Sequence, residues 1–139
     1  MSASAQLRRF ASLPPAERRI VWVALITLPV TWLAVRWLPI RQVHLPPLVA
    51  PPDRRVPPSR IAALVASTAA HLPLPCACLE QSIVTAALLR RRGFAAALVI
   101  GGDKVDARFD AHAWVEYEGS VLTDPVTAAR YTPLWRVSS

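Results

Sequence analysis

Apolar residues fill the stretch from Ile20 to Leu38 almost without interruption, a pattern that predicts one long hydrophobic helix. Pro15 lies near the first helical position, where proline is favoured, whereas Pro29 lies inside the run and is expected to kink it. Before Arg36 the run falls short of the roughly 20 apolar residues that span a bilayer. The pattern therefore leaves three states open: a helix packed on protein, a helix lying on a membrane, and a membrane span.

Helical spacing of apolar residues predicts two further, shorter helices. Ser59 is a plausible N-cap for the first of them, which is expected from Arg60 to about His71. The second is expected from about Cys78 to Arg92, and Gly93 is typical of the position just past a helix end. The three consecutive arginines that close this helix are favourable at its negative end.

The last third of the chain reads as a small antiparallel sheet. Phe94 to Ile100 is a continuous apolar run, typical of a buried strand, and Gly101-Gly102-Asp103 is expected to turn the chain. Apolar and polar residues then alternate from Arg108 to Glu118, which predicts a strand with two different faces. After a turn at Gly119, a returning strand is expected over Ser120 to Thr123.

The alternating strand assigns each side chain to one of two faces. Asp124-Pro125 is expected to end the returning strand, and the tail from Ala128 to Trp135 is expected to cover an edge of the sheet. The residues expected on one face of the alternating strand are Phe109, Ala111, Ala113, Val115 and Tyr117, and those on the other are Asp110, His112, Trp114 and Glu116.

Charge divides the chain into two unlike parts. The net charge is +7, and residues 1–60 carry all of it, with nine arginines against Glu17 and Asp53. Residues 61–139 carry seven basic and seven acidic residues and are neutral. A basic, apolar arm suits anionic lipid or an acidic partner protein. It does not suit nucleic acid, because the arginines occur in pairs between hydrophobic runs and nothing resembles a groove-reading motif.

These patterns predict three segments. Residues 1–44 form a basic, hydrophobic helical extension, residues 45–58 a proline-rich linker, and residues 59–139 the globular domain. The linker is assigned because closely spaced prolines block both a helix and a central strand. Its prolines are Pro46, Pro47, Pro51, Pro52, Pro57 and Pro58.

The two cysteines, Cys76 and Cys78, are separated by one residue. Ordinary disulfide geometry disfavours a bridge across that spacing, and metal-binding pairs usually have two or more residues between the ligands. We therefore expect two free thiols in a reducing compartment, with no metal and no cofactor. No signal peptide is evident, so a cytoplasmic location is expected, with membrane association left open.

Cys78 is the better candidate for a nucleophile. It begins the second predicted short helix, where unsatisfied backbone N–H groups and the positive end of the helix dipole favour thiolate over thiol. The same N–H groups can stabilise the oxyanion of a tetrahedral intermediate. Cys76 follows Pro75, lies before the helix and lacks this benefit.

His112 and Asp124 are candidates for the base and for the group that orients it. Their relation depends on hairpin register, because a two-residue turn at Glu118-Gly119 sets Ala113 opposite Asp124 and puts the two side chains on opposite faces. A three-residue loop sets Trp114 there instead, and the two share a face. A triad therefore predicts a longer loop or a bulge at Gly119, or an Asp124 that reaches back from beyond the strand end.

Several runs together resemble one known family, the transglutaminase-like peptidase of lasso-peptide biosynthesis, in its stand-alone leader-peptidase form. The resemblance covers about residues 60–135, and the basic apolar helix and proline linker before it are also similar. The matching runs are Cys78-Leu79 with Ser82, Leu88 to Gly93, Ala97 to Gly101, Phe109 to Glu116 and Tyr131 to Leu134. Asp110 departs from the family, in which a small residue is expected.

The resemblance implies an α+β fold with a papain- or transglutaminase-like core, in which a nucleophile helix packs on a small antiparallel sheet after a hydrophobic N-terminal helix. It also implies a thiol hydrolase with Cys78 as nucleophile, His112 as general base and acid, and Asp124 as orienter. The implied substrate is a ribosomally made precursor peptide, cut between leader and core. The implied partners are the leader, a separate leader-binding protein and a separate ATP-dependent cyclase that closes the core into a ring.

Three other functions stay open at this stage. A transglutaminase-type acyltransferase would use the same triad, with an amine instead of water as acceptor. A scaffold of this fold would not depend on Cys78. A third alternative is a membrane protein whose soluble domain is incidental to its hydrophobic helix.

Overall fold

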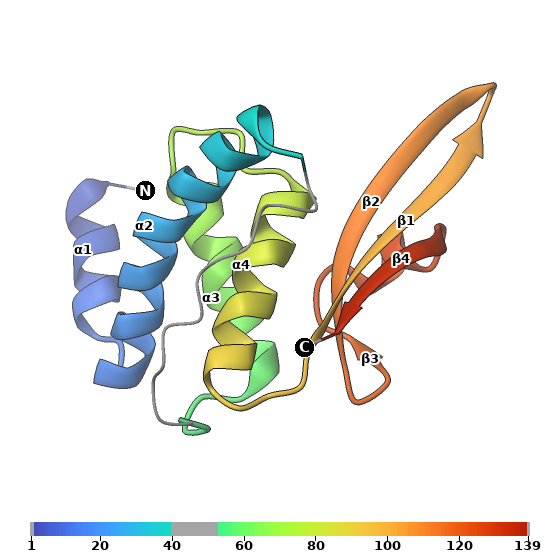
Figure 1. Ribbon diagram of the computed structural model, residues 1–139. Coiled ribbons are helices and arrows are strands. Elements are labelled where there is room, and N and C mark those ends of the chain that lie inside the picture. Colours follow the sequence, from blue (N-terminus) through green and yellow to red (C-terminus); the bar gives the residue numbers. More distant parts are fainter. Residues whose placement is uncertain (1, 40–52, 139) are drawn as a thin grey trace.

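The computed structural model describes residues 2–39 and 53–138 (Figure 1). Of the expected proline-rich linker at 45–58, residues 45–52 lie outside the described part, as do residues 40–44 of the expected N-terminal extension. The helices are α1 (Ala3–Ala11), α2 (Pro15–Trp37), α3 (Pro58–His71), α4 (Cys78–Arg91) and α5 (Pro125–Ala128). The strands are β1 (Ala97–Val105), β2 (Arg108–Tyr117), β3 (Ser120–Val121) and β4 (Thr132–Ser138).

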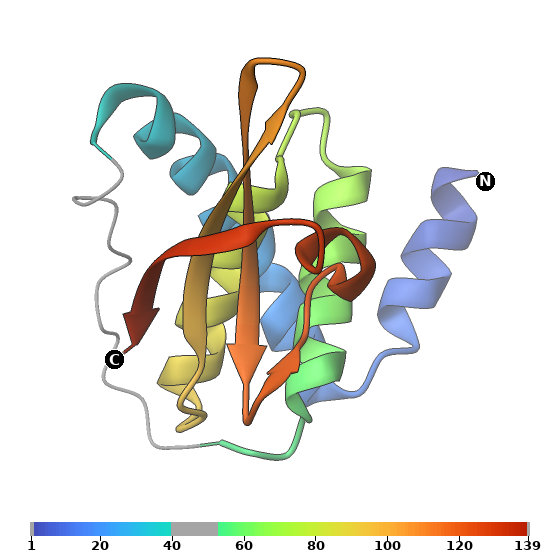
Figure 2. The same ribbon diagram turned by 90° about the vertical axis from the view of Figure 1, so that its right-hand side faces the viewer.

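Helices and strands form two layers. Figure 1 shows α1 to α4 side by side on one side of the molecule and the sheet on the other, and Figure 2 shows the sheet in front of the helices. The sheet has the order β3-β2-β1-β4, and all of its pairings are antiparallel. This arrangement confirms the predicted α+β fold, with the helix that begins at Cys78 packed on a small antiparallel sheet.

The long apolar helix is confirmed as α2, with Pro15 at its first position. One face of α2 packs on α3 and α4, because Ile20, Ala24 and Leu28 are fully buried there. Helix α1 was not predicted. It lies beside α2, and its Phe10 ring meets the Trp22 ring edge-on with 5.7 Å between ring centroids.

The two shorter helices begin and end close to their predicted positions. The proposed N-cap at Ser59 is wrong: Pro57 is the N-cap of α3 and Pro58 opens the helix, since the fixed φ of proline suits the first helical position. Helix α4 begins at Cys78 as predicted. Gly93 follows its end with a φ of 85°, a conformation that glycine adopts without strain.

The turn predicted at Gly101-Gly102-Asp103 is wrong, because these residues continue β1 and the chain turns at Asp106 and Ala107 instead. The glycines serve another purpose. A Cβ at Gly101 would lie 2.5 Å from the Trp114 ring, and one at Gly102 would lie 2.6 Å from the Phe109 ring. Glycine is therefore required where aromatic rings of β2 lie flat on β1.

The two faces of β2 meet two different apolar clusters, as the alternation predicted. Ala113 and Val115 belong to the large core between the helices and the sheet. Trp114 points the other way, into a small cluster with Val99 and Ala128. The large core also contains Ile20, Leu28, Ile61, Val65, Val84, Leu88 and Leu89, which are all buried.

Arg90 holds the end of α4 to the sheet. Its guanidinium donates hydrogen bonds to the carbonyl oxygens of Ala96, before β1, and Val137, in β4, at 3.0 and 2.5 Å. Two paired strands and the end of the helix are thereby fixed together. The expectation that the tail covers an edge of the sheet is confirmed by β4, which pairs with β1.

Candidate functional site

Cys78 is the first residue of α4 and is partly exposed. The N-cap residue, Ala77, has no side chain that can cap the helix, and no side-chain cap is formed. The N–H groups of the first turn have no partner within the helix. The thiol therefore lies at the positive end of the helix dipole, beside donors that can serve an oxyanion.

Cys76 is in a different environment, although both cysteines are free thiols. Burial raises the pKa of the Cys76 thiol, and the buried carboxylate of Glu80 acts in the same direction. The carbonyl oxygen of Cys76 accepts a hydrogen bond of 2.9 Å from the Gln81 side-chain amide, which fastens the segment before the helix to its first turn. Cys76 is thus kept as a neutral thiol, in line with the choice of Cys78 as the candidate nucleophile.

His112 lies on β2, on the face that carries Trp114. Its ring stacks on the Tyr131 ring with 5.1 Å between centroids, and on the Trp114 ring with 6.2 Å. Only 11% of the His112 side chain is exposed, and its Nε2 atom is buried without a hydrogen-bond partner. A buried ring stacked on two aromatic rings has little freedom to turn, so its two nitrogens keep fixed directions.

Asp124 lies beside that nitrogen. Its Oδ2 atom is 3.9 Å from His112 Nε2, while its Oδ1 atom accepts a hydrogen bond of 3.3 Å from the Thr127 N–H as the N-cap of α5. The bond from Thr127 holds the pKa of the Asp124 carboxyl below its usual range, and the nearby His112 acts in the same direction. The carboxylate is therefore charged near neutral pH and available to orient an imidazolium.

The sequence predicted two ways in which Asp124 could reach His112, and the structure shows one of them to be wrong. The turn at Glu118 and Gly119 has two residues, so the longer loop or bulge at Gly119 is wrong. Strand β3 ends at Val121, and Asp124 adopts a left-handed conformation with a φ of 46°. Asp124 thus reaches back from beyond the strand end, which is the alternative that the sequence left open.

Ser82 brings the start of α4 to the edge of β2. Its hydroxyl, one turn after Cys78, donates a hydrogen bond of 3.1 Å to the carbonyl oxygen of Ala113. Along this edge, β3 pairs with Glu116 and Tyr117, and Leu122 bonds to the backbone of Val115, so the described part of β2 before Ala113 has no strand partner on this side. His112 lies on the other face of β2, with Trp114 and Tyr131.

His112 and Asp124 approach to 3.9 Å without a hydrogen bond, and Cys78 and His112 are not joined. In the described part of the chain, Cys78 Sγ makes no hydrogen bond with the His112 ring. Because Nε2 faces Asp124, Nδ1 is the ring nitrogen that remains for the thiol. Catalytic hydrogen bonds of this kind are often long without substrate.

The sequence pattern of the transglutaminase-like superfamily matches residues 22–136, which is most of the chain and includes all three candidate residues. The chain belongs to the transglutaminase-like superfamily. No curated protein and no solved structure matches it. The fold is consistent with cysteine peptidase activity and with acyltransferase activity, and it does not decide between them.

In this transglutaminase-like domain, Tyr131 and Asp110 are functional candidates that the sequence alone did not single out. The Tyr131 hydroxyl donates a hydrogen bond of 2.7 Å to Asp110 Oδ2, which raises the pKa of Tyr131. The bond fixes the ring that stacks on His112. Two signals pointed here: Asp110 departs from the family pattern, and Tyr131 opens one of the matching runs.

A second bracing group lies further along the same face of β2. Glu116 accepts hydrogen bonds from the Trp114 indole at 2.9 Å and from Arg136 of β4 at 2.5 Å. These bonds lower the pKa of Glu116, although desolvation acts against them. They hold the Trp114 ring in place beneath His112.

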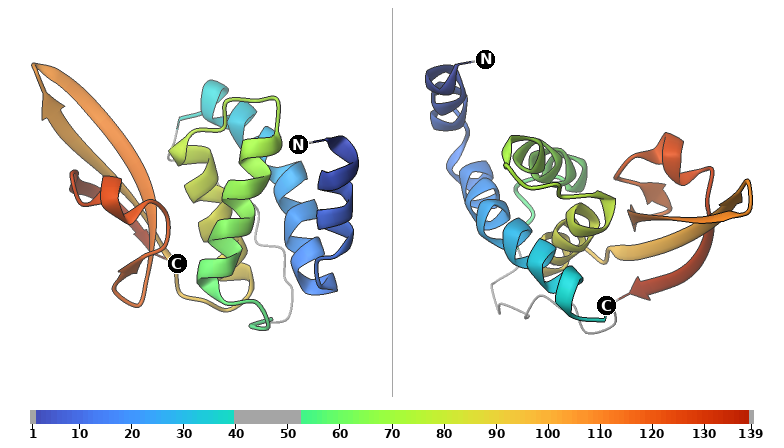
Figure 3. Two further views of the ribbon diagram at one scale, coloured as in Figure 1. Left: turned by 180° about the vertical axis from the view of Figure 1, so that it is seen from behind. Right: turned by 90° about the horizontal axis from the view of Figure 1, so that it is seen from above.

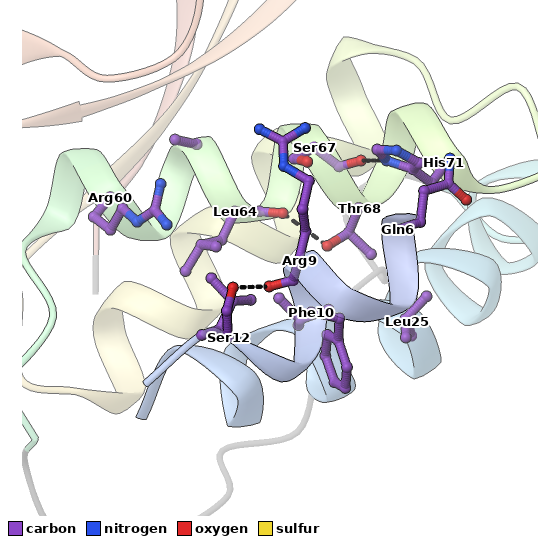
Figure 4. Close-up of a pocket in the computed structure, with 13 residues that line it drawn as sticks. Gln6, Arg9, Phe10, Ser12, Leu25, Arg60, Leu64, Ser67, Thr68 and His71 are labelled. Carbon is purple, nitrogen blue, oxygen red and sulfur yellow. Dashed lines mark hydrogen bonds between the residues drawn. The ribbon is translucent and has the colours of Figure 1, made fainter. Parts of the chain in front are cut away.

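A cavity of about 430 Å³ lies elsewhere, between α1, α2 and α3 (Figure 4). The figure shows Arg9 of α1 extending toward α3, which carries Thr68 and His71, while Phe10 lies beside Leu25 of α2. None of the candidate catalytic residues lines it. Within residues 2–39 and 53–138, no group of three or more His, Cys, Asp or Glu side chains could hold a metal ion.

Proposed function

We propose that this chain is a cysteine peptidase that removes the leader from a lasso-peptide precursor. The observation that carries the proposal is the 3.9 Å approach of His112 Nε2 to Asp124 Oδ2 beside the strand edge to which Ser82 ties the first turn of α4. Cys78 opens that turn. These positions support Cys78 as nucleophile at a helix start, His112 as base on a strand and Asp124 as orienting carboxylate.

The first chemical step forms a thioester. His112 accepts the Cys78 thiol proton at Nδ1, and the thiolate attacks the scissile carbonyl carbon. The uncapped N–H groups of the first turn of α4 stabilise the oxyanion of the tetrahedral intermediate. The C–N bond then breaks, and His112 returns the proton to the leaving amine, which is the new N-terminus of the core.

The second step frees the leader. Water gives a proton to His112, attacks the thioester carbonyl and displaces Cys78 as a thiol when the proton is returned. Asp124 stabilises the imidazolium in both steps and holds the ring so that Nδ1 faces the thiol. The products are a leader with a free carboxylate and a core with a free amine.

The substrate and partners follow from the resemblance of the matching runs to the leader peptidases. A separate leader-binding protein presents the precursor, and a separate cyclase consumes the freed amine. Exposed apolar side chains support a peptide substrate at this place. Phe109 of β2 and Leu134 of β4 are 65% and 61% exposed, and both rest on Gly102 on the helix side of the sheet.

These two side chains provide an apolar surface beyond the start of α4. Figure 1 shows β1 and β2 leaning away from α4 toward their hairpin, so the sheet here is not covered by the helices. A peptide that lies along the open edge of β2 would bury Phe109 next to the scissile bond. Residues that flank the bond are therefore proposed to include an apolar side chain.

The test is to incubate the full chain with a precursor peptide that contains the intact leader-core junction, with and without a leader-binding protein, and to measure fragment masses. Two fragments that sum to the precursor plus one water are expected. Cys78→Ala is expected to abolish cleavage, whereas the matched variant Cys76→Ala is expected to retain it. Cleavage by Cys78→Ala would contradict the proposal and favour a scaffold role.

Acyltransferase activity is distinguished in the same assay. It uses the same thioester, and only the acceptor differs. An added primary amine such as methylamine would then attack the thioester in place of water and leave an amide at the C-terminus of the leader. If the amide product exceeded the free acid at low amine concentration, transfer and not hydrolysis would be the activity.

A further inference from the structure

Helix α2 has a second apolar face, opposite the one that packs on the core. Its side chains are between 53% and 80% exposed. They are Trp22, Ile26, Val30, Leu33 and Trp37, and together they are called the α2 stripe below. At 100° per residue they fall on one side of the helix, whereas Ile20, Ala24 and Leu28 fall on the other. Figure 3 shows α2 along the outer side of the helical layer.

The dimensions of the α2 stripe suit a large flat partner. From Trp22 to Trp37 it is about 22 Å long at 1.5 Å per residue, which exceeds the size of a pocket for one side chain. Isolated exposed apolar residues are common, but a continuous stripe of five on one helix marks a binding surface. Helix α2 is also long and apolar enough to cross a membrane by length and composition, and most of it is not buried.

Positive charge surrounds the stripe. Arg19 lies on the same side of α2 at its start, and Arg36 flanks the stripe at its end, with its guanidinium 4.4 Å from the Trp32 ring centroid. The acidic residue in residues 2–39 is Glu17, and Arg60 already pairs with it at 2.9 Å. Uncompensated negative charge is therefore absent from the described part of α1 and α2.

We propose that the α2 stripe docks the protein on an anionic phospholipid bilayer, with α2 lying in the plane of the membrane surface. Arginine and tryptophan at both ends of an apolar stripe match the headgroup region, where phosphates and amphipathic rings meet. A span would require α2 to leave α3 and α4, which would uncover to water the apolar core that Ile20, Ala24 and Leu28 help to fill.

Lipid is favoured over a second copy of the chain by charge. A symmetric pair of α2 stripes would bring Arg19 and Arg36 of one copy near those of the other, where no described carboxylate of α1 or α2 is free to pair with them. An anionic surface meets both arginines at once. Docking is independent of the proposed peptidase chemistry, because no candidate catalytic residue lies on α2.

The test is sedimentation of the full chain with phosphatidylcholine vesicles that contain about 30% of the anionic lipid phosphatidylglycerol. Binding is expected to the mixed vesicles and to be about tenfold weaker to pure phosphatidylcholine. It is also expected to weaken as salt is raised, because exposed charges are screened. Tryptophan fluorescence of the unmodified protein should shift to the blue on binding and be quenched by brominated lipid.

Variants locate the contact. Ile26→Asn with Leu33→Asn is expected to weaken binding by about tenfold or more, since two exposed apolar side chains no longer enter the headgroup region. Val126→Asn is the matched control, because Val126 is 80% exposed but lies on α5. It should bind like the unmodified chain. All of these sites are exposed, so the circular dichroism of the folded protein should not change.

Four results would overturn the proposal. The first is that the unmodified chain does not sediment with anionic vesicles, and the second is that Val126→Asn loses as much vesicle binding as Ile26→Asn with Leu33→Asn. The third is that the protein resists carbonate extraction, as expected of a membrane span. The fourth is a dimer in solution that Ile26→Asn with Leu33→Asn converts to a monomer. Each can occur with peptidase activity intact. Failure of membrane docking therefore does not count against the peptidase proposal. Absence of peptidase activity likewise does not count against membrane docking.

Discussion

The two faces of β2 are one residue apart in sequence and have different tasks. One face, with Ala113 and Val115, is buried in the large core against the helices. The other, with His112 and Trp114, meets a small cluster and the ring of Tyr131. The first face is apolar and closely packed. The second holds a histidine whose buried Nε2 atom has no hydrogen-bond partner.

The difference shows how a short strand can separate stability from chemistry. Side chains alternate in direction, so a core residue and a candidate catalytic residue can be neighbours without sharing an environment. The helix face packs β2 against the core, and the other face carries His112, the proposed base. Substitutions on the core face should therefore change the free energy of unfolding, and substitutions on the other face should change the rate of peptide cleavage.

The largest effect is expected from His112→Ala. Loss of the general base should lower kcat/KM for precursor cleavage by about 10³-fold or more, while the urea midpoint of unfolding changes little. The measurement is single-variant kinetics combined with urea denaturation. If unfolding shifted strongly while activity per folded molecule stayed unchanged, His112 would be a structural residue.

Val115→Ala is expected to do the opposite. Val115 is fully buried, and truncation should cost about 2 kcal/mol of unfolding free energy through lost burial and a residual cavity. The activity per folded molecule should remain within about twofold of the original, because additive effects are expected at sites that share no partner. A large loss of kcat without loss of stability would erase the distinction between the faces.

Asp124→Asn should have a smaller effect on activity. The Asp124 side chain is 54% exposed and lies 3.9 Å from His112, and an ion pair of that kind contributes at most about 1 kcal/mol, or about fivefold in kcat/KM. Kinetics at pH 7 checks the size. A loss as large as that of His112→Ala would contradict this size and show that the charge of the carboxylate is essential for orienting His112.

Asparagine is a useful replacement because it also caps helices. The pKa of Asp124 lies below its ordinary value of 3.8, so the cap is fully formed above that pH and is lost as the pH falls through the folded value. The urea midpoint of the unmodified chain should therefore fall between pH 5 and pH 2 by slightly more than that of Asp124→Asn. No difference between the two would mean that the negative charge of Asp124 adds nothing to the cap at α5.

The smallest effect is expected from Tyr131→Phe. This variant keeps the ring that stacks on His112 but removes the hydroxyl that bonds to Asp110, so kcat should fall only about twofold to threefold. Tyr131→Leu removes the ring as well and should lower kcat further. The acidic limb of the pH profile should move with Tyr131→Leu if the ring positions His112, and a purely structural role predicts lower stability with an unchanged profile.

Much of the fold could be predicted because its signals are local. Apolar spacing located α3 and α4, and the alternation from Arg108 to Glu118 assigned both faces of β2 before any contact was known. Gly93 marked a helix end by its conformational freedom. Each of these features depends on residues that lie close together in the sequence, within one or two helical turns or within one strand.

The failures arise from contacts between distant residues. Gly101 and Gly102 looked like a turn, but they are glycines because the rings of Trp114 and Phe109 occupy the space of a Cβ. The reach of Asp124 depends on a left-handed residue after a two-residue turn, which register alone left open. Tyr131 was placed at an edge, and its stacking on His112 follows only from the pairing of β4 with β1.

The most direct measurement is the alkylation rate of each thiol by iodoacetamide, read by peptide mass between pH 5 and 9. Cys78 should react at least about tenfold faster than Cys76 at pH 7, because it lies at the helix start whereas burial and Glu80 raise the pKa of Cys76. His112→Ala should slow Cys78 and leave Cys76 unchanged. Equal rates for the two thiols, or a Cys78 rate that ignores His112, would contradict the assignment of Cys78 as the nucleophile.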